Sequence, residues 1–383
     1  MYNPNSSQRK RIITISGTPC SGKSTVNTIL AQELGYQTHS IGSWVKQLAL
    51  ESGLTPEAFY KQNEIEIDGQ KRELDQYLDP WQQQLGEQKE RFILDSRLGF
   101  YFVPQSFRVF LSCDFEVAAQ RIHQIRSRNP AYASAEYETI EKARETIEKR
   151  TNADERKNYA EKYGIPDFRL PFHFDLPIDT TTKAPEEVAK QILEQYLKYE
   201  KVTGEIERSC WALMMVVAKS HTYMSGPITG SRSLYETMKE HGVRRKEDLP
   251  KEAYDRIRQE NVDRSRRIEQ EWVAKYDSPV LLPGKLGSAD IWSQRDYVDL
   301  SKEVMRLKAT EFVFEDGWEY SNGSVEEFLL ALTLKKPMLD QRRNPLNKEQ
   351  GIHLLTTSVE EIHQASLECP KLDFLLEQLR KAA

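Results

Sequence analysis

The sequence is poor in cysteine, and its cysteines form no cluster. Cys20, Cys113, Cys210 and Cys369 are spread over 383 residues, and no CxxC pair occurs. A disulfide framework or a zinc finger needs closely spaced cysteines, so neither is expected. We expect free thiols, which are typical of a reducing cytoplasm.

Long apolar runs and net positive charge are also missing. The longest apolar run, Cys210–Ala218, has about half of the ~18 residues that a membrane span requires, and the polar start of the chain leaves no room for a signal peptide. The chain has 54 Lys and Arg against 59 Asp and Glu, a net charge of −5. We therefore expect a cytoplasmic protein that binds neither nucleic acid nor membranes. Small phosphorylated ligands remain compatible with this charge.

Short apolar strands alternate with helices, which predicts parallel sheets in an α/β fold. The length allows two to three domains. The polar segment around Gly204 suggests a boundary. We expect a tail at 1–9, a first domain at 10–199, a linker at 200–209 and a second domain at 210–383. The expected strands are 11–16, 91–95, 107–112, 174–179, 210–218, 278–282 and 311–314, and the expected helices are 23–34, 135–163, 185–199, 250–276, 325–334 and 372–381.

Residues 17–24 form a glycine-rich phosphate loop between an expected strand and an expected helix. They read Gly-Thr-Pro-Cys-Ser-Gly-Lys-Ser, which fits the pattern GxxxxGK[ST]. Backbone N–H groups of such a loop hold phosphate oxygens. Lys23 is expected to reach the β- and γ-phosphates of ATP, and Ser24 to hold Mg²⁺. The predicted cofactor-binding residues are Gly17, Thr18, Pro19, Cys20, Ser21, Gly22, Lys23, Ser24 and Thr25.

Charged residues downstream complete this first candidate site. Asp95 ends a strand and can share the Mg²⁺ shell with Ser24, and Arg97 can clamp a phosphate. A group of later arginines predicts a lid that neutralises phosphoryl charge. For any single arginine, the alternative is an exposed helix face paired with nearby glutamates. The group consists of Arg121, Arg126, Arg128, Arg144, Arg150 and Arg156.

Residues 10–197 resemble cytidylate kinases of the short, archaeal type. The resemblance implies ATP·Mg²⁺-dependent phosphorylation of CMP or dCMP by a P-loop parallel-sheet domain. The motifs that carry it are Ile13–Pro19, Ser40–Gly42, Leu94–Leu98, Asn129-Pro130, Arg150-Thr151, Glu155-Arg156, Tyr163–Ile165 and Phe174–Thr180. The implied catalytic residues are Lys23, Arg97, Arg150 and Arg156. The implied acceptor-binding residues are Ser40, Gly42, Asp68, Arg72, Asp95, Arg97, Arg126 and Arg128.

The chain departs from that family at three positions. Ser43 and Pro166 stand where the family usually has Asp, and Lys46 where it has Arg. The phosphate-binding residues are kept, while the acceptor pocket is altered. A P-loop kinase for another acceptor is therefore an open alternative.

The second half carries a carboxylate in a loop-to-helix context. Glu326 and Glu327 follow the glycine of Ser321-Asn-Gly-Ser-Val, at the edge of a parallel sheet where ligands bind. Adjacent helical residues point about 100° apart, so only one of them can face a pocket. Upstream lies the loop Tyr223–Gly230, and between them lie Asp296 and Asp299.

This order of residues resembles the nucleoside 2-deoxyribosyltransferase superfamily, which includes deoxynucleoside-monophosphate N-glycosidases. The resemblance implies a Rossmann-like α/β domain in which Glu327 attacks C1′ of the sugar and Tyr223 orients it. An aspartate, Asp299 or Asp296, would assist the leaving base or bind the sugar. It also implies a homodimer through this domain. The remaining substrate-binding residues would be Ser225, Gly226, Thr229, Gly230, Ser321 and Gly323.

Together these patterns predict a bifunctional enzyme of nucleotide metabolism. One half would phosphorylate a pyrimidine monophosphate, and the other would cleave or transfer at an N-glycosidic bond. The alternative is an active kinase whose second domain only binds nucleotide, as a regulatory or oligomerisation module. The segment Lys239–Tyr276, rich in arginine, could be a lid or an interface in either case.

Overall fold

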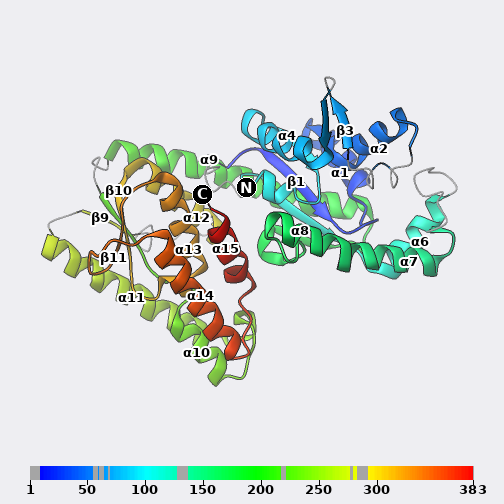
Figure 1. Ribbon diagram of the computed structural model, residues 1–383. Helices are drawn as coiled ribbons and strands as arrows, with labels where there is room; N and C mark the ends of the chain where they lie inside the picture. Colours follow the sequence, from blue (N-terminus) through cyan, green and yellow to red (C-terminus); the bar gives the residue numbers. More distant parts are fainter. Residues whose placement is uncertain are drawn as a thin grey trace. The chain divides into compact units, whose positions relative to one another are not determined.

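The structure of the chain is a computed structural model. It describes residues 9–54, 59, 64–67, 70–126, 137–216, 221–276, 279–282 and 292–382. The side chains of residues 64–67, 70–72, 126, 153–156, 207–216 and 294 lie outside the description. The chain forms two compact units, Arg9–Lys201 and Val202–Ala383 (Figure 1).

The first unit is built on a five-stranded parallel sheet with the order β2-β5-β1-β6-β7. The central strand β1 is buried along its whole length, as expected for a parallel strand with helices on both faces. The α/β fold with a P-loop sheet is therefore confirmed. The strands are β1 (Ile12–Gly17), β2 (Gln37–Ser40), β5 (Phe92–Asp95), β6 (Phe107–Ser112) and β7 (Leu176–Asp179).

Successive side chains of β1 point to opposite faces of this sheet, so the strand contributes to the packing on both faces. Ile13 and Ile15 join a core that includes Leu30 of α1 (Lys23–Leu34) and Ile192 of α9 (Pro185–Val216). Thr14 points the other way, toward α5 (Gly99–Phe102). The remaining elements are α2 (Ile41–Glu51), β3 (Glu64–Ile67), β4 (Gln70–Glu73), α4 (Leu74–Gln88), α6 (Phe115–Arg126), α7 (Ile140–Lys149), a π-helical turn (Arg150–Asp154), α8 (Glu155–Tyr163) and a 3₁₀ turn (Pro171–His173).

The expected linker at 200–209 and the expected strand at 210–218 are both wrong, because helix α9 continues unbroken from Pro185 to Val216. Up to Lys201 it belongs to the first unit, and from Val202 to the second. Val202 and Ile206 pack against Leu300 and Val304, so the helix keeps a buried face through the polar segment. The apolar run that follows contains Ala, Leu and Met, which extend a helix readily.

The second unit contains a four-stranded parallel sheet with the order β11-β10-β8-β9. This second parallel sheet agrees with the predicted fold class. Its first strand is β8, eleven residues later than the predicted start at Cys210. The strands are β8 (His221–Ser225), β9 (Val280–Leu281), β10 (Ala309–Phe314) and β11 (Met338–Asp340). The helices are α10 (Arg232–Glu240), α11 (Lys251–Tyr276), α12 (Gln294–Lys308), α13 (Asn322–Leu334), α14 (Lys348–Gln364) and α15 (Pro370–Lys381), with 3₁₀ turns at Lys246–Asp248 and Trp318–Tyr320.

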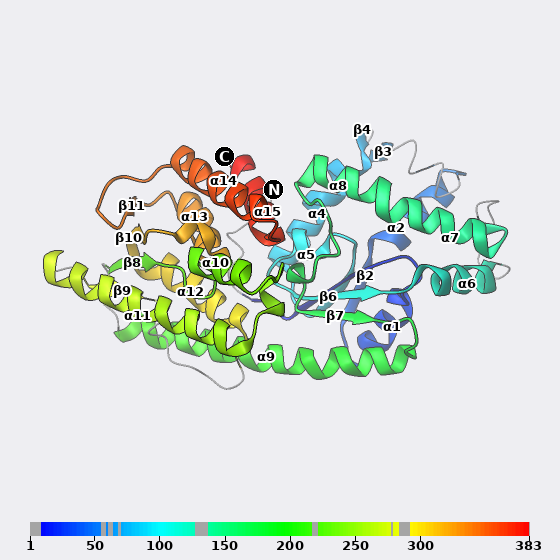
Figure 2. The same ribbon diagram turned by 90° about the horizontal axis from the view of Figure 1, so that it is seen from below.

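Strands β8 and β10 turn alternate side chains to opposite faces of this sheet. Met224 and Val313 pack with Trp272 of α11, whereas Tyr223 faces α13 and bonds to Glu327. The two views agree that the strands lie between α11 and α13 (Figures 1 and 2). Helix α11 is thus part of the core rather than a lid. Within the described residues, no helix is long and apolar enough to cross a membrane.

We predict that Gly351→Ala destabilises the second unit. A Cβ at Gly351 would overlap the ring of Phe328, which is fully buried and stacked on Trp318 at 4.5 Å between ring centroids. Overpacking of this kind costs about 1–3 kcal/mol. Differential scanning calorimetry should show a lower Tm. The matched control is Gly323→Ala, also in a helix, where the nearest atom to a Cβ would be the Ser321 hydroxyl oxygen at 4.0 Å; equal Tm values for the two variants would refute the packing argument.

Candidate functional site

The phosphate loop follows β1 as predicted, and its shape depends on close approach to β6. A Cβ on Gly17 would overlap the carbonyl oxygen of Leu111, so this position accepts only glycine. The N–H of Thr18 donates to the same carbonyl at 3.0 Å. Lys23 Nζ donates to the carbonyl oxygens of Gly17 at 3.1 Å and Thr18 at 2.9 Å. These contacts hold the ammonium over the loop at the start of α1.

Charged side chains of both signs act on Lys23 at the carboxyl edge of the sheet. Burial lowers the pKa of Lys23 to about 8, and the Asp95 carboxylate opposes that shift. Burial likewise raises the pKa of Asp95, against the pull of Lys23 and of a hydrogen bond that Ser40 donates at 3.2 Å. Arg97 and Arg150 both act electrostatically on Lys23. The structure therefore brings together five of the predicted kinase residues.

The predicted arginine lid is only partly described. Arg121 is not free to move, because it donates to the carbonyl oxygens of Cys20 at 3.0 Å and Thr180 at 2.8 Å. It ties the phosphate loop to the residues after β7. Arg144 pairs with Glu148 at 3.1 Å and with Glu116 at 3.9 Å, which is the exposed helix-face alternative. The side chains of Arg126 and Arg156, and all of Arg128, lie outside the described residues.

The predicted acceptor residues are placed less completely. Ser40 caps α2 by accepting the N–H of Ser43, so one departure from the family pattern lies in that cap. Lys46 acts electrostatically on Asp95, which keeps a cation near the phosphate loop where the family has arginine. Gly42 has open space at its Cβ position. Asp68 and the side chain of Arg72 lie outside the described residues.

The residues at this edge fit ATP and Mg²⁺. Magnesium prefers oxygen ligands, and the predicted ligands are the Ser24 hydroxyl on the first turn of α1 and the Asp95 carboxylate. The loop N–H groups, Lys23, Arg97 and Arg150 provide the positive field that a triphosphate needs. ATP and Mg²⁺ are thus the cofactors for which this unit is built.

In the second unit, Tyr223 and Ser225 meet the carboxylate of Glu327. The Tyr223 hydroxyl donates to Oε1 at 2.7 Å, and the Ser225 hydroxyl donates to Oε2 at 2.5 Å. All three side chains are buried. Glu327 lies in the second turn of α13, because the helix begins at Asn322. Ser225, predicted to bind substrate, is therefore a partner of the carboxylate.

Burial decides the protonation of this group. Desolvation raises the pKa of Glu327 to about 7, although the two hydroxyl donors oppose the shift. Burial and the neighbouring carboxylate raise the pKa of Tyr223 well above its ordinary range, so the phenol remains a donor. A carboxyl group poised near neutrality and held by two donors is typical of a functional site.

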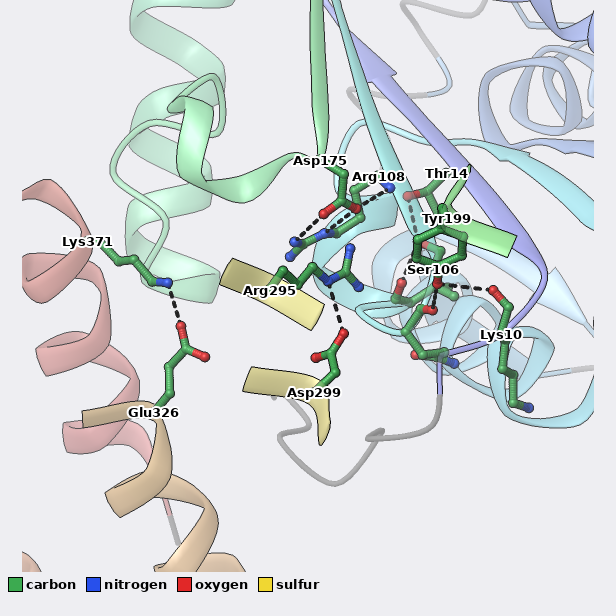
Figure 3. Close-up of polar contacts among 12 residues, drawn as sticks. Lys10, Thr14, Ser106, Arg108, Asp175, Tyr199, Arg295, Asp299, Glu326 and Lys371 are labelled. Atoms are coloured by element: carbon green, nitrogen blue, oxygen red, sulfur yellow. Dashed lines mark hydrogen bonds and ion pairs between the residues drawn. The ribbon is translucent and has the colours of Figure 1, made fainter. Parts of the chain in front are cut away.

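Its neighbour Glu326 points elsewhere, as the helical geometry requires. Glu326 is paired with Lys371 of α15 at 2.6 Å (Figure 3) and with Lys302 of α12 at 3.1 Å. Burial acts to raise the pKa of Glu326, but the two ammonium groups hold it well below its ordinary value. Glu326 is therefore ionised and structural, and Glu327 is the carboxylate available for chemistry.

The loop after β8 lies close to the start of α13. A Cβ on Gly230 would come within 3.3 Å of the Ser321 Cα, and the Ser321 hydroxyl caps α13 by accepting the N–H of Ser324. Thr229 belongs to the same loop, and Gly323 lies in the first turn of α13. The predicted glycine loop and the helix N-terminus are thus brought together, as in anion-binding sites.

Sequence reasoning missed the support that α11 gives to this loop. Asn261 donates to the carbonyl oxygen of Ile228 at 3.2 Å and to the Ser231 hydroxyl at 3.1 Å. Ser265 donates at 2.8 Å to Glu315, a fully buried carboxyl group that lies against Gly226. Burial raises the pKa of Glu315. Only the four-residue spacing of Asn261, Ser265 and Glu269 on one helix face could have indicated these contacts.

The two candidate aspartates have different roles at the start of α12. Asp296 is the third residue of α12 and closes its capping box, because its carboxylate accepts the N–H of Ser293. Asp299 pairs with Arg295 at 3.4 Å (Figure 3). Asp296 is thus explained by the helix cap, which leaves Asp299 as the better candidate for contact with substrate.

The fold and the phosphate loop define the first unit as a P-loop phosphotransferase. A family described as an AAA domain matches residues 13–144. A cytidylate kinase from Natronomonas pharaonis is 34% identical over 179 residues, which are 46% of this chain and 84% of that protein. The chain belongs to the cytidylate kinase family through this half.

Two further similarities concern about half of the chain. An S-adenosylmethionine-dependent nucleotide dehydratase from Lacinutrix mariniflava is 32% identical over 195 residues, which are 51% of this chain but only 37% of that protein. The chain thus spans well under half of the length of that relative. A solved shikimate kinase from Acinetobacter baumannii in complex with shikimate shares 16% identity with a TM-score of 0.32, covering 51% of this chain and 98% of that one.

We predict that Glu327 titrates near pH 7, and that Tyr223→Phe raises its pKa further. A hydrogen bond donated to a carboxylate favours the ionised form, so its loss shifts the pKa upward. Infrared difference spectra between wild type and Glu327→Gln, recorded against pH, would follow the carboxyl stretch. Glu326→Gln removes a like charge and should lower the pKa of Glu327. Titration of Glu327 at the ordinary glutamate value would show that burial does not control it.

Proposed function

We propose that the chain is a bifunctional enzyme of nucleotide metabolism. The first unit transfers a phosphoryl group from ATP to a cytidine or deoxycytidine monophosphate. The second unit cleaves or transfers at the N-glycosidic bond of a nucleoside or its monophosphate. The observation that carries the second activity is the pair of hydroxyl groups, Tyr223 and Ser225, that hold both oxygens of the buried Glu327.

In the first unit, catalysis would consist of positioning and charge neutralisation. Lys23 would move from the loop carbonyls to the transferring phosphate, and Arg97 and Arg150 would stabilise the charge that develops on its oxygens. Mg²⁺ held by Ser24 and Asp95 would neutralise the remaining phosphate charge. Lys46 would contact the phosphate of the acceptor. Because Ser43 and Pro166 replace family residues, another monophosphate acceptor remains the alternative for this unit.

In the second unit, an ionised Glu327 would attack C1′ of the sugar. The bond from C1′ to the base nitrogen breaks, its electron pair leaves with the base, and a sugar–enzyme ester forms. Asp299 would deliver the proton that the leaving base needs. Water or a second base then attacks C1′ and releases Glu327. Tyr223 and Ser225 would fix the carboxylate geometry, while Gly230, Thr229 and the N-terminus of α13 would bind a 5′-phosphate.

A nucleoside monophosphate would serve both units, either gaining a phosphate or losing its base. This shared substrate supplies a reason for joining them in one chain. A homodimer formed through the second unit, and location in the cytoplasm, remain predictions from the sequence. A second unit that only binds nucleotide is the competing account, and it makes no use of a nucleophile.

Products formed from CMP, dCMP, dUMP and dTMP, with and without ATP·Mg²⁺, would test this proposal. Wild type should release free base without ATP and form diphosphate with it. Glu327→Gln should lower base release roughly 1,000-fold or more, because it removes the nucleophile, and should leave diphosphate formation intact. Lys23→Ala should do the reverse, lowering diphosphate formation at least about 100-fold.

Each variant is thus the control for the other activity, and chromatography of the products reads both. Diphosphate without free base under any condition would reduce the chain to a kinase with a nucleotide-binding domain. Diphosphate from a monophosphate other than CMP or dCMP would instead correct the acceptor of the first unit.

A further inference from the structure

Three different metal-ligating groups converge where α14 ends and α15 begins. The ring nitrogen Nε2 of His363 lies 2.8 Å from Oδ1 of Asp373, and the Cys369 sulfur lies 3.8 Å from that nitrogen. The same sulfur lies 4.0 Å from Oδ2 of Asp373. The ligand atoms all lie within 4.8 Å of one another. This His–Cys–Asp cluster has no part in the function proposed above.

The turn between the two helices produces this convergence. Helix α14 ends at Gln364, and Ser366 has a positive φ of 60° that reverses the chain. Cys369 caps α15, with Pro370 as its first residue. His363 therefore lies in the last turn of one helix, and Asp373 in the first turn of the next. The cysteine is held between them by the turn itself.

An ordinary ion pair explains only part of the cluster. The side chains of His363 and Asp373 are 49% and 35% exposed, and an exposed pair of this kind contributes little to stability. The pair of His363 and Asp373 does not explain why the Cys369 thiol lies beside both side chains. Cys369 is only 5% exposed, and its sulfur is directed at both partners.

We propose that His363, Cys369 and Asp373 form a binding site for Zn²⁺. Ordinary zinc bonds are ~2.0–2.3 Å, and a tetrahedral arrangement then separates nitrogen from oxygen by about 3.3 Å and sulfur from nitrogen by about 3.6 Å. The nitrogen–oxygen and sulfur–nitrogen distances in the structure differ from these values by roughly half an ångström or less, and one ligand atom from each residue lies within 4.8 Å of the others. Small side-chain rotations would therefore complete the coordination.

The mix of ligands determines which metal fits. Thiolate and imidazole select zinc over Mg²⁺ and Ca²⁺, which prefer oxygen. Three protein ligands leave the fourth position to water. Binding would replace the thiol proton by the metal, so one proton is released from Cys369 for each ion bound.

The site would act on the second unit through α15. Lys371 lies between two of the ligands in sequence and pairs with Glu326 at 2.6 Å. A metal ion that fixes the first turn of α15 would thus also fix the partner of the residue next to Glu327. The inference itself concerns binding, and it stands whether or not the second unit cleaves a glycosidic bond.

Zinc binding to the full chain can be measured by competition with a chromophoric chelator. One ion per chain is expected in the wild type, and the affinity should fall roughly 100-fold or more in Cys369→Ser and His363→Gln. Loss of an outer partner of a metal site alone costs 10–100-fold, and loss of a ligand costs at least as much. His353→Gln, an exposed histidine on the same helix, is the matched control and should bind like wild type.

Titration with Co²⁺ gives a second readout, and its wild-type spectrum can be interpreted without any variant. A thiolate-to-cobalt charge-transfer band with tetrahedral visible bands is expected in the wild type and not in Cys369→Ser. Circular dichroism checks that each variant is folded. If one of the variants is unfolded, Asp373→Asn is tested in its place. Wild-type protein without stoichiometric binding, or equal affinity in His363→Gln and His353→Gln, would overturn the proposal.

Discussion

The second unit depends on the two-residue period of a buried parallel strand. In β8, Tyr223 and Ser225 point to the face where α13 presents Glu327, and Met224 between them points into the core under α11. A shift of one residue would bury both hydroxyl groups against Trp272 and leave the carboxylate without donors. Burial of an unpaired carboxylate is costly. The same register thus supports both the core and the candidate site.

The first unit also buries charged groups at the carboxyl edge of its sheet, and there the charges are of both signs. Lys23 and Asp95 are both desolvated, and each moderates the pKa shift of the other. The phosphate loop that precedes Lys23 can approach β6 only because Gly17 has no side chain. Arg121 then ties that loop to the residues after β7 through backbone carbonyls. Phosphate-binding geometry is therefore set by main-chain packing, and the charged side chains are added to it.

Local patterns predicted the parts of the structure that local physics controls. The phosphate loop and the order from Tyr223 to Glu327 could be read because each joins a short motif to the end of a parallel strand. The contact of Lys371 with Glu326 joins residues far apart in sequence and leaves no pattern, and the contact of Asn261 with the loop leaves only the four-residue spacing of polar residues on α11. The continuation of α9 was missed because a short apolar run fits a strand or a buried helix equally well. The spacing of the cysteines gives no sign of the cluster around Cys369, because its partners are a histidine and an aspartate across a turn.

The adjacent glutamates Glu326 and Glu327 of α13 have pKa values shifted in opposite directions, because one helix presents them to different surroundings. Glu326, whose side chain is 12% exposed, pairs with two ammonium groups and remains ionised, while Glu327 is buried with neutral donors and has a pKa near 7. Opposite shifts in neighbouring acids are what assign distinct roles to them. The negative charge on Glu326 also raises the pKa of Glu327, and Lys371 compensates for part of that charge. Helix α15 thus contacts the neighbour of Glu327 through Lys371, whereas the cation that acts on Glu327 itself is Lys302 of α12.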